Sequence, residues 1–217
     1  KGMRIIFNLN ELDKAISASK LEAKKSVDDD TVYIEKFLIN PKHIEIQILA
    51  DSHGNVISLG ERDCSIQHKH QKLIEECPST ILTQKEREHI STLCIKAIQS
   101  IGYEGVGTFE FLYENGNFYF MEMNTRLQVE HPVTEMVTQM DLVKQQILVA
   151  YGEKLDIKQN DVMLKGHALE CRINAEHPET FMPSPGKVKQ YHQPGGLGVR
   201  VDSAIYQSSS VLPHYDS

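Results

Sequence analysis

The chain has 217 residues, and its contents of 40% hydrophobic and 24% charged residues are ordinary for a soluble globular protein. Its formal net charge of −7 argues against a general nucleic-acid binder, because neutralising phosphates requires a basic surface. We find no apolar run long enough to cross a membrane and no signal-peptide pattern, so we expect no membrane partner. The 4 cysteines are dispersed without the spacing of a zinc site, and we expect a reduced, cytoplasmic setting. Both ends resemble cuts within a longer protein.

The first part of the chain predicts two strands on either side of a helix. The opening stretch to Phe7 is rich in apolar residues and predicts a strand, and residues 11–25 predict a helix with a weak apolar face. A second strand is expected over residues 31–38. Asn40-Pro41 then breaks the chain, because proline lacks a backbone donor and restricts the residue before it.

Two β-hairpins are predicted further along. Residues 43–49 alternate polar and apolar side chains and precede a second strand over residues 55–59, with a turn-like sequence between them. The other hairpin joins residues 107–113 to residues 117–123 across Asn115-Gly116, which is a strong signal for a tight turn.

Two helices with capping signals are also predicted. Thr83 and Glu86 have the spacing of a capping box, and Gly102 is expected to end that helix. Its expected buried stripe is Ile90, Leu93, Cys94, Ala97, Ile98 and Ile101. Thr134 is expected to cap a later helix that Gly152 closes. The expected apolar face of that helix is Met136, Met140, Val143, Ile147 and Tyr151.

Beyond Gln159 the chain becomes irregular and strand-rich, and prolines and glycines interrupt it. This change predicts a second unit that begins near Lys165. Together the elements predict an α+β fold with mainly antiparallel strands.

Two carboxylates on the second hairpin are candidates for a metal site. Glu110 and Glu122 each lie between large apolar residues. A strict two-residue turn would place them on opposite faces of the sheet, so a shared face requires a bulge or an odd loop length. With Asn124 they would then form a cluster of hard oxygen ligands suited to Mg²⁺. The alternative is a solvated carboxylate pair at the rim of the sheet.

Every second residue from position 122 to position 130 is polar. These residues are Glu122, Asn124, Arg126, Gln128 and Glu130. If the stretch is extended, all five side chains project to one side. Such a strip could bind a metal, hold an anion and supply a base, and the alternative is an amphipathic strand with one wet face.

Two other regions carry concentrated charge. Residues 61–72 are dense in cations and amides, so they could form a loop that binds phosphate or bicarbonate, or a solvated charge run. Within them, Cys64 is more simply interpreted as a small buried thiol than as a nucleophile. Arg172 alternates with apolar neighbours on an expected strand, and the residues alone favour an ordinary ion pair over a site cation.

Several stretches together resemble biotin carboxylase, the ATP-grasp component of acetyl-CoA carboxylase and of related biotin-dependent carboxylases. In order along the chain they are residues 61–65, 70–72, 120–135, 171–176, 183–187 and 215–217. The resemblance implies an internal fragment. It places the C-terminal portion of an ATP-grasp domain at residues 1–157, with a lid remnant over about residues 1–38, and the start of the biotin carboxylase C-terminal domain at residues 165–217. Lys1-Gly2-Met3 is similar to the exit of the family's glycine-rich phosphate loop.

The resemblance also implies a ligase that carboxylates biotin on a carrier protein, using ATP and bicarbonate through carboxyphosphate. This would be the first half-reaction of acetyl-CoA carboxylase, in fatty acid synthesis, or of a related carboxylase. Implied cofactors are ATP, Mg²⁺ or Mn²⁺, and biotin as carrier-bound substrate. Implied partners are a biotin carboxyl carrier protein or domain, a carboxyltransferase and further copies of the full-length chain. We expect residues 1–217 alone to be inactive.

Site residues follow from the resemblance by position. The residues similar to the adenine-contacting hinge are Glu35, Lys36 and Leu38, and those similar to ribose or phosphate contacts are His43, Gln67 and His70. The residues similar to magnesium ligands are Glu110, Glu122 and Asn124. The residues similar to the bicarbonate pocket are Lys72, Arg126, Gln128 and the backbone of Val129. Glu130 resembles the base that deprotonates bicarbonate, and Arg172 resembles the cation that stabilises the biotin enolate.

Two other functions remain open from the sequence. The first is a different ATP-grasp ligase, of the carbamoyl phosphate synthetase type, which shares the pattern of two glutamates and an asparagine. Residues 126–132 with Arg172 downstream are not expected there. The second is a non-catalytic nucleotide-binding or purely structural piece.

Overall fold

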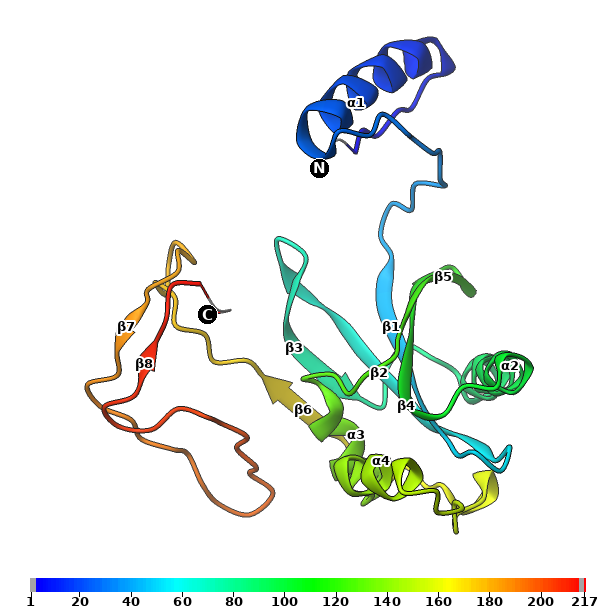
Figure 1. The fold of residues 1–217 in the computed structure, drawn as a ribbon, viewed down its shortest axis with the longest axis vertical. Helices are drawn as coiled ribbons and strands as arrows, with labels where there is room; N and C mark the ends of the chain where they lie inside the picture. The colour runs from blue at the N-terminus through cyan, green and yellow to red at the C-terminus, as the bar shows by residue number, and fades with distance from the viewer. Residues whose placement is uncertain (1–2, 215–216) are drawn as a thin grey trace.

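The computed structural model of the chain describes residues 3–214 and residue 217 (Figure 1). Its main body is a 6-stranded sheet in the order β5-β4-β1-β2-β3-β6, and each neighbouring pair is antiparallel. The strands are β1 (Lys42–Ala50), β2 (Val56–His68), β3 (Gln71–Cys77), β4 (Gly105–Glu114), β5 (Asn117–Asn124) and β6 (Ala168–Cys171). The α+β class with mainly antiparallel strands is therefore confirmed.

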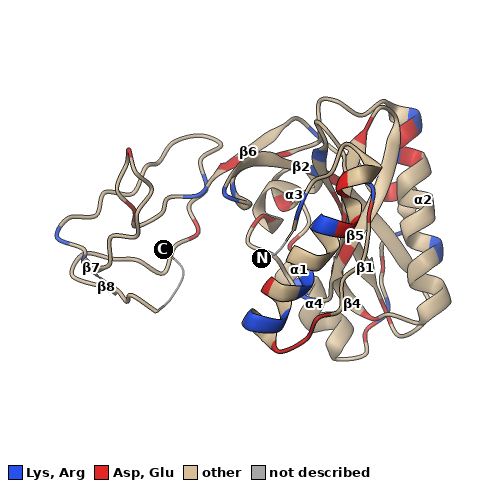
Figure 2. Cartoon of the chain, turned by 90° about the horizontal axis from the view of Figure 1, so that it is seen from above, with Lys and Arg blue, Asp and Glu red and all other residues tan. Residues whose placement is uncertain are grey.

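The helices lie on both faces of this sheet and beyond it. They are α1 (Leu12–Val27), α2 (Gln84–Ile101), α3 (His131–Thr138) and α4 (Leu142–Ala150), with short 3₁₀ turns at Leu9–Glu11 and Gln159–Asp161. A small second sheet pairs β7 (Gly186–Lys187) with β8 (Ser210–Val211). Lysine, arginine, aspartate and glutamate are spread along α2 and along the central strands, where both signs of charge occur (Figure 2).

The strand β1 shows how the sheet is covered on two sides. Ile44, Ile46 and Ile48 are fully buried and belong to the core that includes the apolar side of α2. Successive strand residues point to opposite faces, so Glu45 and Gln47 lie on the other face. Both are nevertheless fully buried. The polar face of β1 is therefore a buried polar layer and not a solvent surface.

The core around α2 follows the predicted cap but only part of the predicted stripe. The capping box between Thr83 and Glu86 is present, and Gly102 ends the helix with a left-handed conformation at φ 64°. Ile90, Cys94 and Ile98 are buried, which confirms half of the stripe. Leu93 and Ile101 are exposed, because the helix is covered by the sheet on one narrow side.

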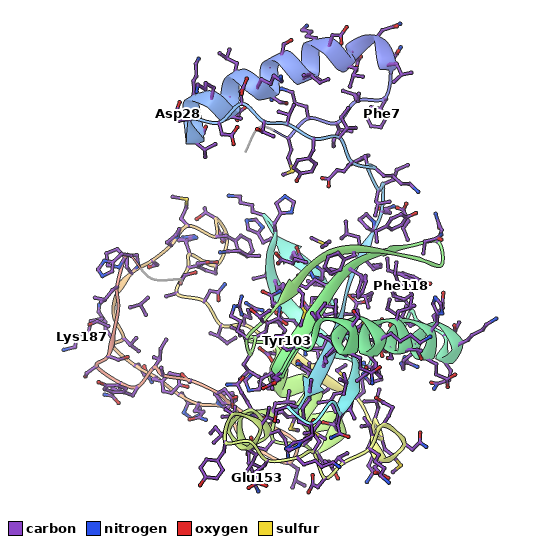
Figure 3. The ribbon with its side chains drawn as sticks, turned by 45° about the vertical axis from the view of Figure 1, so that its right-hand side comes forward. Phe7, Asp28, Tyr103, Phe118, Glu153 and Lys187 are labelled. Carbon is purple, nitrogen blue, oxygen red and sulfur yellow. The ribbon has the colours of Figure 1, made fainter. Side chains whose placement is uncertain are left out.

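The strands predicted before residue 40 are wrong. In the described part of the chain, the stretch up to Phe7 and residues 31–38 form no strand, and no sheet partner lies beside them. The helix predicted at residues 11–25 is confirmed as α1, and Asp28 ends it at φ 57°. Figures 1 and 3 show α1, between the labelled Phe7 and Asp28, standing apart from the large sheet. An apolar stretch cannot form a strand without an edge to pair with.

Residues 61–72 are mostly strand and not the expected loop. β2 continues past residue 59 to His68, turns through Lys69 and His70 at φ 49° and 67°, and returns as β3. The charged residues of β2 can lie inside the protein because their side chains have polar or charged partners there. Glu61, for example, is fully buried and pairs with Arg87 of α2 at 2.6 Å.

The single helix predicted after Pro132 is two helices. The predicted cap Thr134 lies inside α3 and is fully buried, while Gln139 ends α3 at φ 58° and Asp141 caps α4. This break changes the phase of the helix after Gln139, so the members of the predicted apolar face that follow Met140 point outward. The exposed members are Met136, Val143, Ile147 and Tyr151, and only Met140 is buried. Val133, Val137, Leu142 and Val149 are buried instead.

The last part of the chain begins by extending the large sheet. β6 pairs with β3, and after it the chain runs through irregular segments to the β7–β8 pair (Figure 1). The division into residues 1–157 and 165–217 stays a prediction, and the resemblances at Lys1-Gly2 and Tyr215-Asp216 lie outside the described residues. Among the described residues, no helix has the length and apolar character needed to cross a membrane.

Candidate active site

One rung of the large sheet carries four charged side chains from four strands. Arg62 of β2 is the cross-strand partner of Glu45 on β1, which in turn faces Glu110 of β4, and Glu110 faces Glu122 of β5. Cross-strand partners share a face of the sheet. The register of β4 and β5 shifts between Glu110 and Phe111, which is the bulge that a shared face for Glu110 and Glu122 requires.

Arg62 is the centre of this buried polar layer. Its side chain is fully buried, and its guanidinium donates hydrogen bonds to Glu45, Gln47, Thr108, Gln128 and Thr134. The distances are 2.6 Å from Nη1 to Gln47 Oε1 and 2.7 Å from Nη2 to Gln128 Oε1. Arg62 therefore joins three strands to α3 and to the turn before it.

Lys72, on β3, lies among three carboxylates. Its Nζ is 2.7 Å from Glu130 Oε1 and 3.2 Å from Glu110 Oε1, and it also contacts Glu45. Burial opposes the ionisation of Glu110, but its contacts with His43 and Lys72 outweigh burial and lower its pKa to about 2. Burial likewise raises the pKa of Glu130, yet the charges of Lys72 and Arg62 keep that pKa below its usual value. Both carboxylates are therefore ionised at neutral pH.

His43 and two amides complete the surroundings of Glu110. His43 Nε2 lies 2.7 Å from Glu110 Oε2, and its Nδ1 lies 3.0 Å from the amide nitrogen of Gln67. Glu110 Oε1 accepts hydrogen bonds from Asn124 Nδ2 at 2.6 Å and from Gln128 Nε2 at 2.7 Å. Gln128 thus connects Arg62 to Glu110.

Arg172 joins this group from the end of β6. Its Nε donates to Glu75 Oε1 at 2.7 Å and its Nη2 donates to Glu130 Oε2 at 2.9 Å. We name the whole group the charged cluster, and its members are Glu45, Arg62, Lys72, Glu75, Glu110, Glu130 and Arg172. It combines an ionised carboxylate beside two cations with further carboxylates, and the amides of Asn124 and Gln128 contact it, which is an arrangement that can hold an anion next to a base.

The polar strip at residues 122–130 is not one strand. Strand alternation therefore does not place its five polar side chains on one side. β5 ends at Asn124, and Gln128 and Glu130 come from the turn that leads into α3. Both side chains are nevertheless buried in the charged cluster. Arg126 and Glu122 are exposed. The structure therefore brings together Asn124, Gln128 and Glu130 but leaves Arg126 outside.

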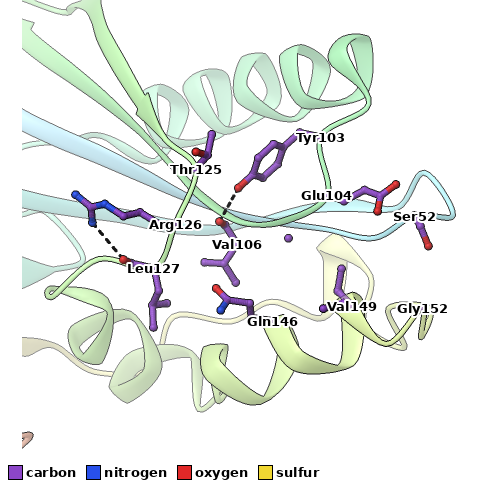
Figure 4. A pocket seen from close by; sticks show the side chains of 12 residues that line it. Ser52, Tyr103, Glu104, Val106, Thr125, Arg126, Leu127, Gln146, Val149 and Gly152 are labelled. Carbon is purple, nitrogen blue, oxygen red and sulfur yellow. Dashed lines mark hydrogen bonds between the residues drawn. The ribbon is translucent and has the colours of Figure 1, made fainter.

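Arg126 lies instead at the rim of a groove beside the cluster. Its Nη1 donates a hydrogen bond to the carbonyl of Leu127 at 3.2 Å (Figure 4). The groove has a volume of about 540 Å³, and its lining includes Tyr103 and Gln146. The Tyr103 hydroxyl donates a hydrogen bond to the Val106 carbonyl at 2.8 Å. None of the carboxylates of the charged cluster lines it.

The residues similar to the nucleotide contacts are spread over a wider area. Glu35 and Lys36 are exposed on the segment between α1 and β1, where Lys36 Nζ donates to the Tyr119 hydroxyl at 2.7 Å, while Leu38 is buried. His70 is exposed in the turn between β2 and β3. The side chain of Val129 is exposed.

The donor set of the cluster fits a hard divalent cation. Ligand atoms of His43, Glu45 and Glu110 lie within 4.8 Å of one another, and those of Glu45, Cys64 and Glu130 do so as well. Carboxylate oxygens predominate, and Mg²⁺ prefers oxygen ligands. Burial raises the pKa of Cys64 well above its usual value, so the thiol stays protonated and is a poor ligand.

Sequence reasoning missed three members of the cluster: Glu45, Arg62 and Glu75. The alternation of β1 was recognised, but a polar face on a strand usually faces water. The predicted hairpin ended at residue 59, so it did not include Arg62, and the pairing of acidic Glu45 with basic Arg62 arises because β2 continues to His68. All three are fully buried, and Arg62 also contacts Thr134 of α3, which is distant in the sequence.

Two protein-family models match the chain. The model described as carbamoyl-phosphate synthase L chain, ATP binding domain, covers residues 1–158, and the model described as biotin carboxylase C-terminal domain covers residues 170–217. Among curated proteins, biotin carboxylase from Pseudomonas aeruginosa is 58% identical over 217 residues, covering 100% of this chain and 48% of the relative. A pyruvate carboxylase subunit from Methanothermobacter thermautotrophicus is 55% identical, covering 100% and 44%.

Solved structures of biotin carboxylases are similar to the whole of this chain. A biotin carboxylase complex with beta-gamma-ATP from Campylobacter jejuni has a TM-score of 0.91 and 51% identity, covering 100% of this chain and 49% of that one. The biotin carboxylase domain of the Hydrogenobacter thermophilus 2-oxoglutarate carboxylase, in complex with MgADP, ADP and bicarbonate, has a TM-score of 0.91 and 49% identity, covering 100% and 48%. The chain spans about half the length of the curated relatives it matches.

Proposed function

We propose, from the premise that the chain belongs to the carbamoyl-phosphate synthase L chain, ATP binding domain family, that the protein containing it carboxylates biotin at the expense of ATP. The match to a biotin carboxylase C-terminal domain and the identity of 58% to a biotin carboxylase support this choice within the family. The substrates would be ATP, bicarbonate and biotin attached to a carrier protein or domain.

The observation that carries the proposal is the setting of Glu130. This buried carboxylate lies 2.7 Å from Lys72 and 2.9 Å from Arg172, and its pKa is kept below the usual value. An ionised base next to cations can take the proton of a bound bicarbonate while the cations hold the resulting anion. The residues proposed to hold bicarbonate are Lys72, Arg126, Gln128 and the backbone of Val129.

In the proposed first step, Glu130 takes the proton of bicarbonate, and a bicarbonate oxygen attacks the γ-phosphorus of ATP. The bond from that phosphorus to the bridging oxygen breaks, so the products are carboxyphosphate and ADP. Arg126 would have to turn from the Leu127 carbonyl toward the cluster, and its exposed position leaves room for that rotation. The residues proposed to place the nucleotide are Glu35, Lys36, Leu38, His43, Gln67 and His70.

The carboxylates and the amide near Glu110 fit magnesium. Asn124 donates a hydrogen bond from Nδ2 to Glu110 Oε1 at 2.6 Å, so its amide group lies next to that carboxylate. Glu122 is the cross-strand partner of Glu110, so oxygen-bearing side chains gather on one face. We propose Glu110, Glu122 and Asn124 as the residues that hold the ion. When bound, magnesium neutralises the charge of the transferring phosphates and helps to place them.

In the second step carboxyphosphate breaks down to CO₂ and phosphate. The released phosphate takes the N–H proton of the ureido ring of biotin, and the nitrogen of the resulting enolate form bonds to the carbon of CO₂. We assign Arg172 to the enolate oxygen, because a fixed cation stabilises charge that develops in the transition state. Its two hydrogen bonds to Glu75 and Glu130 hold the guanidinium at the cluster.

The finer assignment is the first half-reaction of acetyl-CoA carboxylase or of a related carboxylase, with a carboxyltransferase as partner. Matches to both a biotin carboxylase and a subunit of pyruvate carboxylase support a role in this group of enzymes. The acceptor of the carboxyl group would be set by that partner.

The test uses the complete protein that contains this chain. Release of ADP is measured with and without bicarbonate, biotin and ammonia, for the natural protein, for Glu130→Gln and for the control Glu153→Gln, whose carboxylate is exposed. We expect bicarbonate-dependent ADP release and carboxybiotin in the natural protein and the control, and loss of both in Glu130→Gln. Carbamoyl phosphate formed from ammonia, with no carboxybiotin, would contradict the proposal.

A further inference from the structure

Two carboxyl groups face each other between β3 and β6, beside Arg172. Glu75 is the direct cross-strand partner of Glu170. The Cβ atoms of such partners are typically about 4.5–5.5 Å apart, and like charges placed directly opposite are destabilising. Glu75 is fully buried and Glu170 is half-buried, so water screens this pair poorly.

One oxygen of each group lacks a hydrogen-bond partner. Glu75 Oε1 accepts from Arg172 Nε at 2.7 Å, but Glu75 Oε2 is buried and has no partner among the described residues. Glu170 Oε2 is also buried and has no hydrogen-bond partner within the described part of the chain. A proton on one of the two groups would remove the repulsion between like charges, and a protonated carboxyl can donate a hydrogen bond where an ionised one can only accept.

The charges around this pair favour such a proton. Burial raises the pKa of Glu170 to about 7, and the negative charge of Glu75 adds to the increase while Arg172 opposes it. Burial also raises the pKa of Glu75, against the charge and the hydrogen bond of Arg172. The other charged groups around the pair are Lys72 from β3, Arg62 from β2, Glu130 from the turn before α3, and Arg172, which directly follows β6. The side chains of α3 nearest to β6, such as Val133 and Val137, are apolar.

We propose that Glu75 and Glu170 share one proton and are positioning residues that hold the Arg172 guanidinium toward Glu130. Alternate residues on a strand share a face, so Glu170 and Arg172 lie on the same face of β6. With the shared proton in place, Arg172 has one ionised partner on β3 and directs its Nη2 to Glu130. When that proton is lost, Glu170 becomes a second carboxylate within reach of Arg172 and competes with Glu130 for the guanidinium.

This role rests on the proposed function, because Arg172 is assigned to the biotin enolate there. It predicts that biotin carboxylation by the complete protein falls as pH rises through about 7, while bicarbonate-dependent ATP cleavage, which precedes the enolate, falls less. The reason is that loss of the shared proton displaces Arg172, which serves only the second step.

The first test is the variant Glu170→Gln in the complete protein. Its amide can donate permanently where the shared proton donates, so we expect carboxylation at the natural rate below pH 7 and no decline above it. Glu75→Gln removes the ionised partner of Arg172, and a misplaced guanidinium should lower carboxylation by about tenfold or more relative to ATP cleavage. An alkaline decline that is the same in Glu170→Gln and in the natural protein would overturn the proposal.

The second test does not depend on turnover. Infrared difference spectra of the complete protein, recorded below and above pH 7, should show the carbonyl band of a protonated carboxyl that disappears above pH 7 and is missing in Glu170→Gln. Spectra that do not differ between the variant and the natural protein would overturn the shared proton. Failure of the proposed function has another signature, since the natural protein would then show the band but carboxylate no biotin at any pH. That outcome would also overturn the assigned role of the pair.

Discussion

Replacing Arg62 by methionine should be among the most damaging single changes in this chain. Methionine has a similar length but no donor, so the change removes the hydrogen bonds to Glu45, Gln47 and Gln128 together with those to Thr108 and Thr134. Arg62 and Glu45 are both fully buried. Glu45 would keep its contact with Lys72 but would lose the cation on its other oxygen.

The expected cost follows from this burial. Removing one partner of a buried ion pair costs about 3–5 kcal/mol, because the other charge is left without compensation. For a folded unit of this size, each kcal/mol lowers Tm by roughly 2–4 °C, so we expect a decrease of roughly 6–20 °C. The double variant Arg62→Met with Glu45→Gln should recover part of the loss, because it removes both charges.

The assay is thermal unfolding of the complete protein, with hydrogen exchange of the amides in β1, β2 and β4 to report on this sheet separately. The matched control is Arg200→Met. Arg200 also donates to carboxylates, those of Asp202 and Glu135, but it is partly exposed, and such pairs contribute about 0–1 kcal/mol. If Arg62→Met destabilises the protein no more than Arg200→Met does, the reasoning about the buried layer is refuted.

Four further outcomes are expected. Glu122→Gln in the complete protein should cripple ATP turnover by weakening the placement of magnesium and nucleotide, and normal turnover at ordinary Mg²⁺ would remove this residue from the site. Glu130→Ala should abolish bicarbonate-dependent ATP cleavage but spare nucleotide binding. Arg172→Ala should instead retain a larger fraction of ATP cleavage than of biotin carboxylation. Equal losses of the two activities in the Arg172 variant would indicate a structural role. The pKa of Glu110 is lowered to about 2, so its contribution to the free energy of unfolding should be complete above pH 4.5 and should disappear as pH falls toward 2. In thermal unfolding, Glu110→Gln should lack this decrease of stability between pH 4.5 and 2. Residues 1–217 alone should not carboxylate free biotin, because they span only about half the length of the curated relatives, and turnover near that of the complete protein would contradict this.

Local signals in the sequence predicted much of the sheet and of α2. Asn115-Gly116 has the residue types of a tight turn, and both residues have positive φ, at 51° and 78°. Thr83 and Glu86 satisfy each other's backbone groups, so their capping box needs no tertiary support. The bulge next to Glu110 could be stated only as a condition, because a register shift depends on how two strands pack.

What the sequence could not predict depends on distant partners. The left-handed residue Gln139, which divides α3 from α4, is not a residue type that ordinarily ends a helix. The apolar stretch before Phe7 predicted a strand, but no neighbouring strand is available to it in the described part of the chain. The burial of Arg62 could not be predicted, because its partners include Gln128 and Thr134, which lie 66 and 72 residues later in the chain.

The central claim is that bicarbonate, activated by Glu130, attacks the γ-phosphorus of ATP. The most direct measurement supplies the complete protein with bicarbonate labelled in all its oxygens with a heavy isotope, and analyses the released phosphate by mass spectrometry. If bicarbonate is the attacking group, one labelled oxygen remains on the phosphate when carboxyphosphate breaks down, and carboxybiotin carries the others. Phosphate without label, released while biotin becomes carboxylated, would contradict the account.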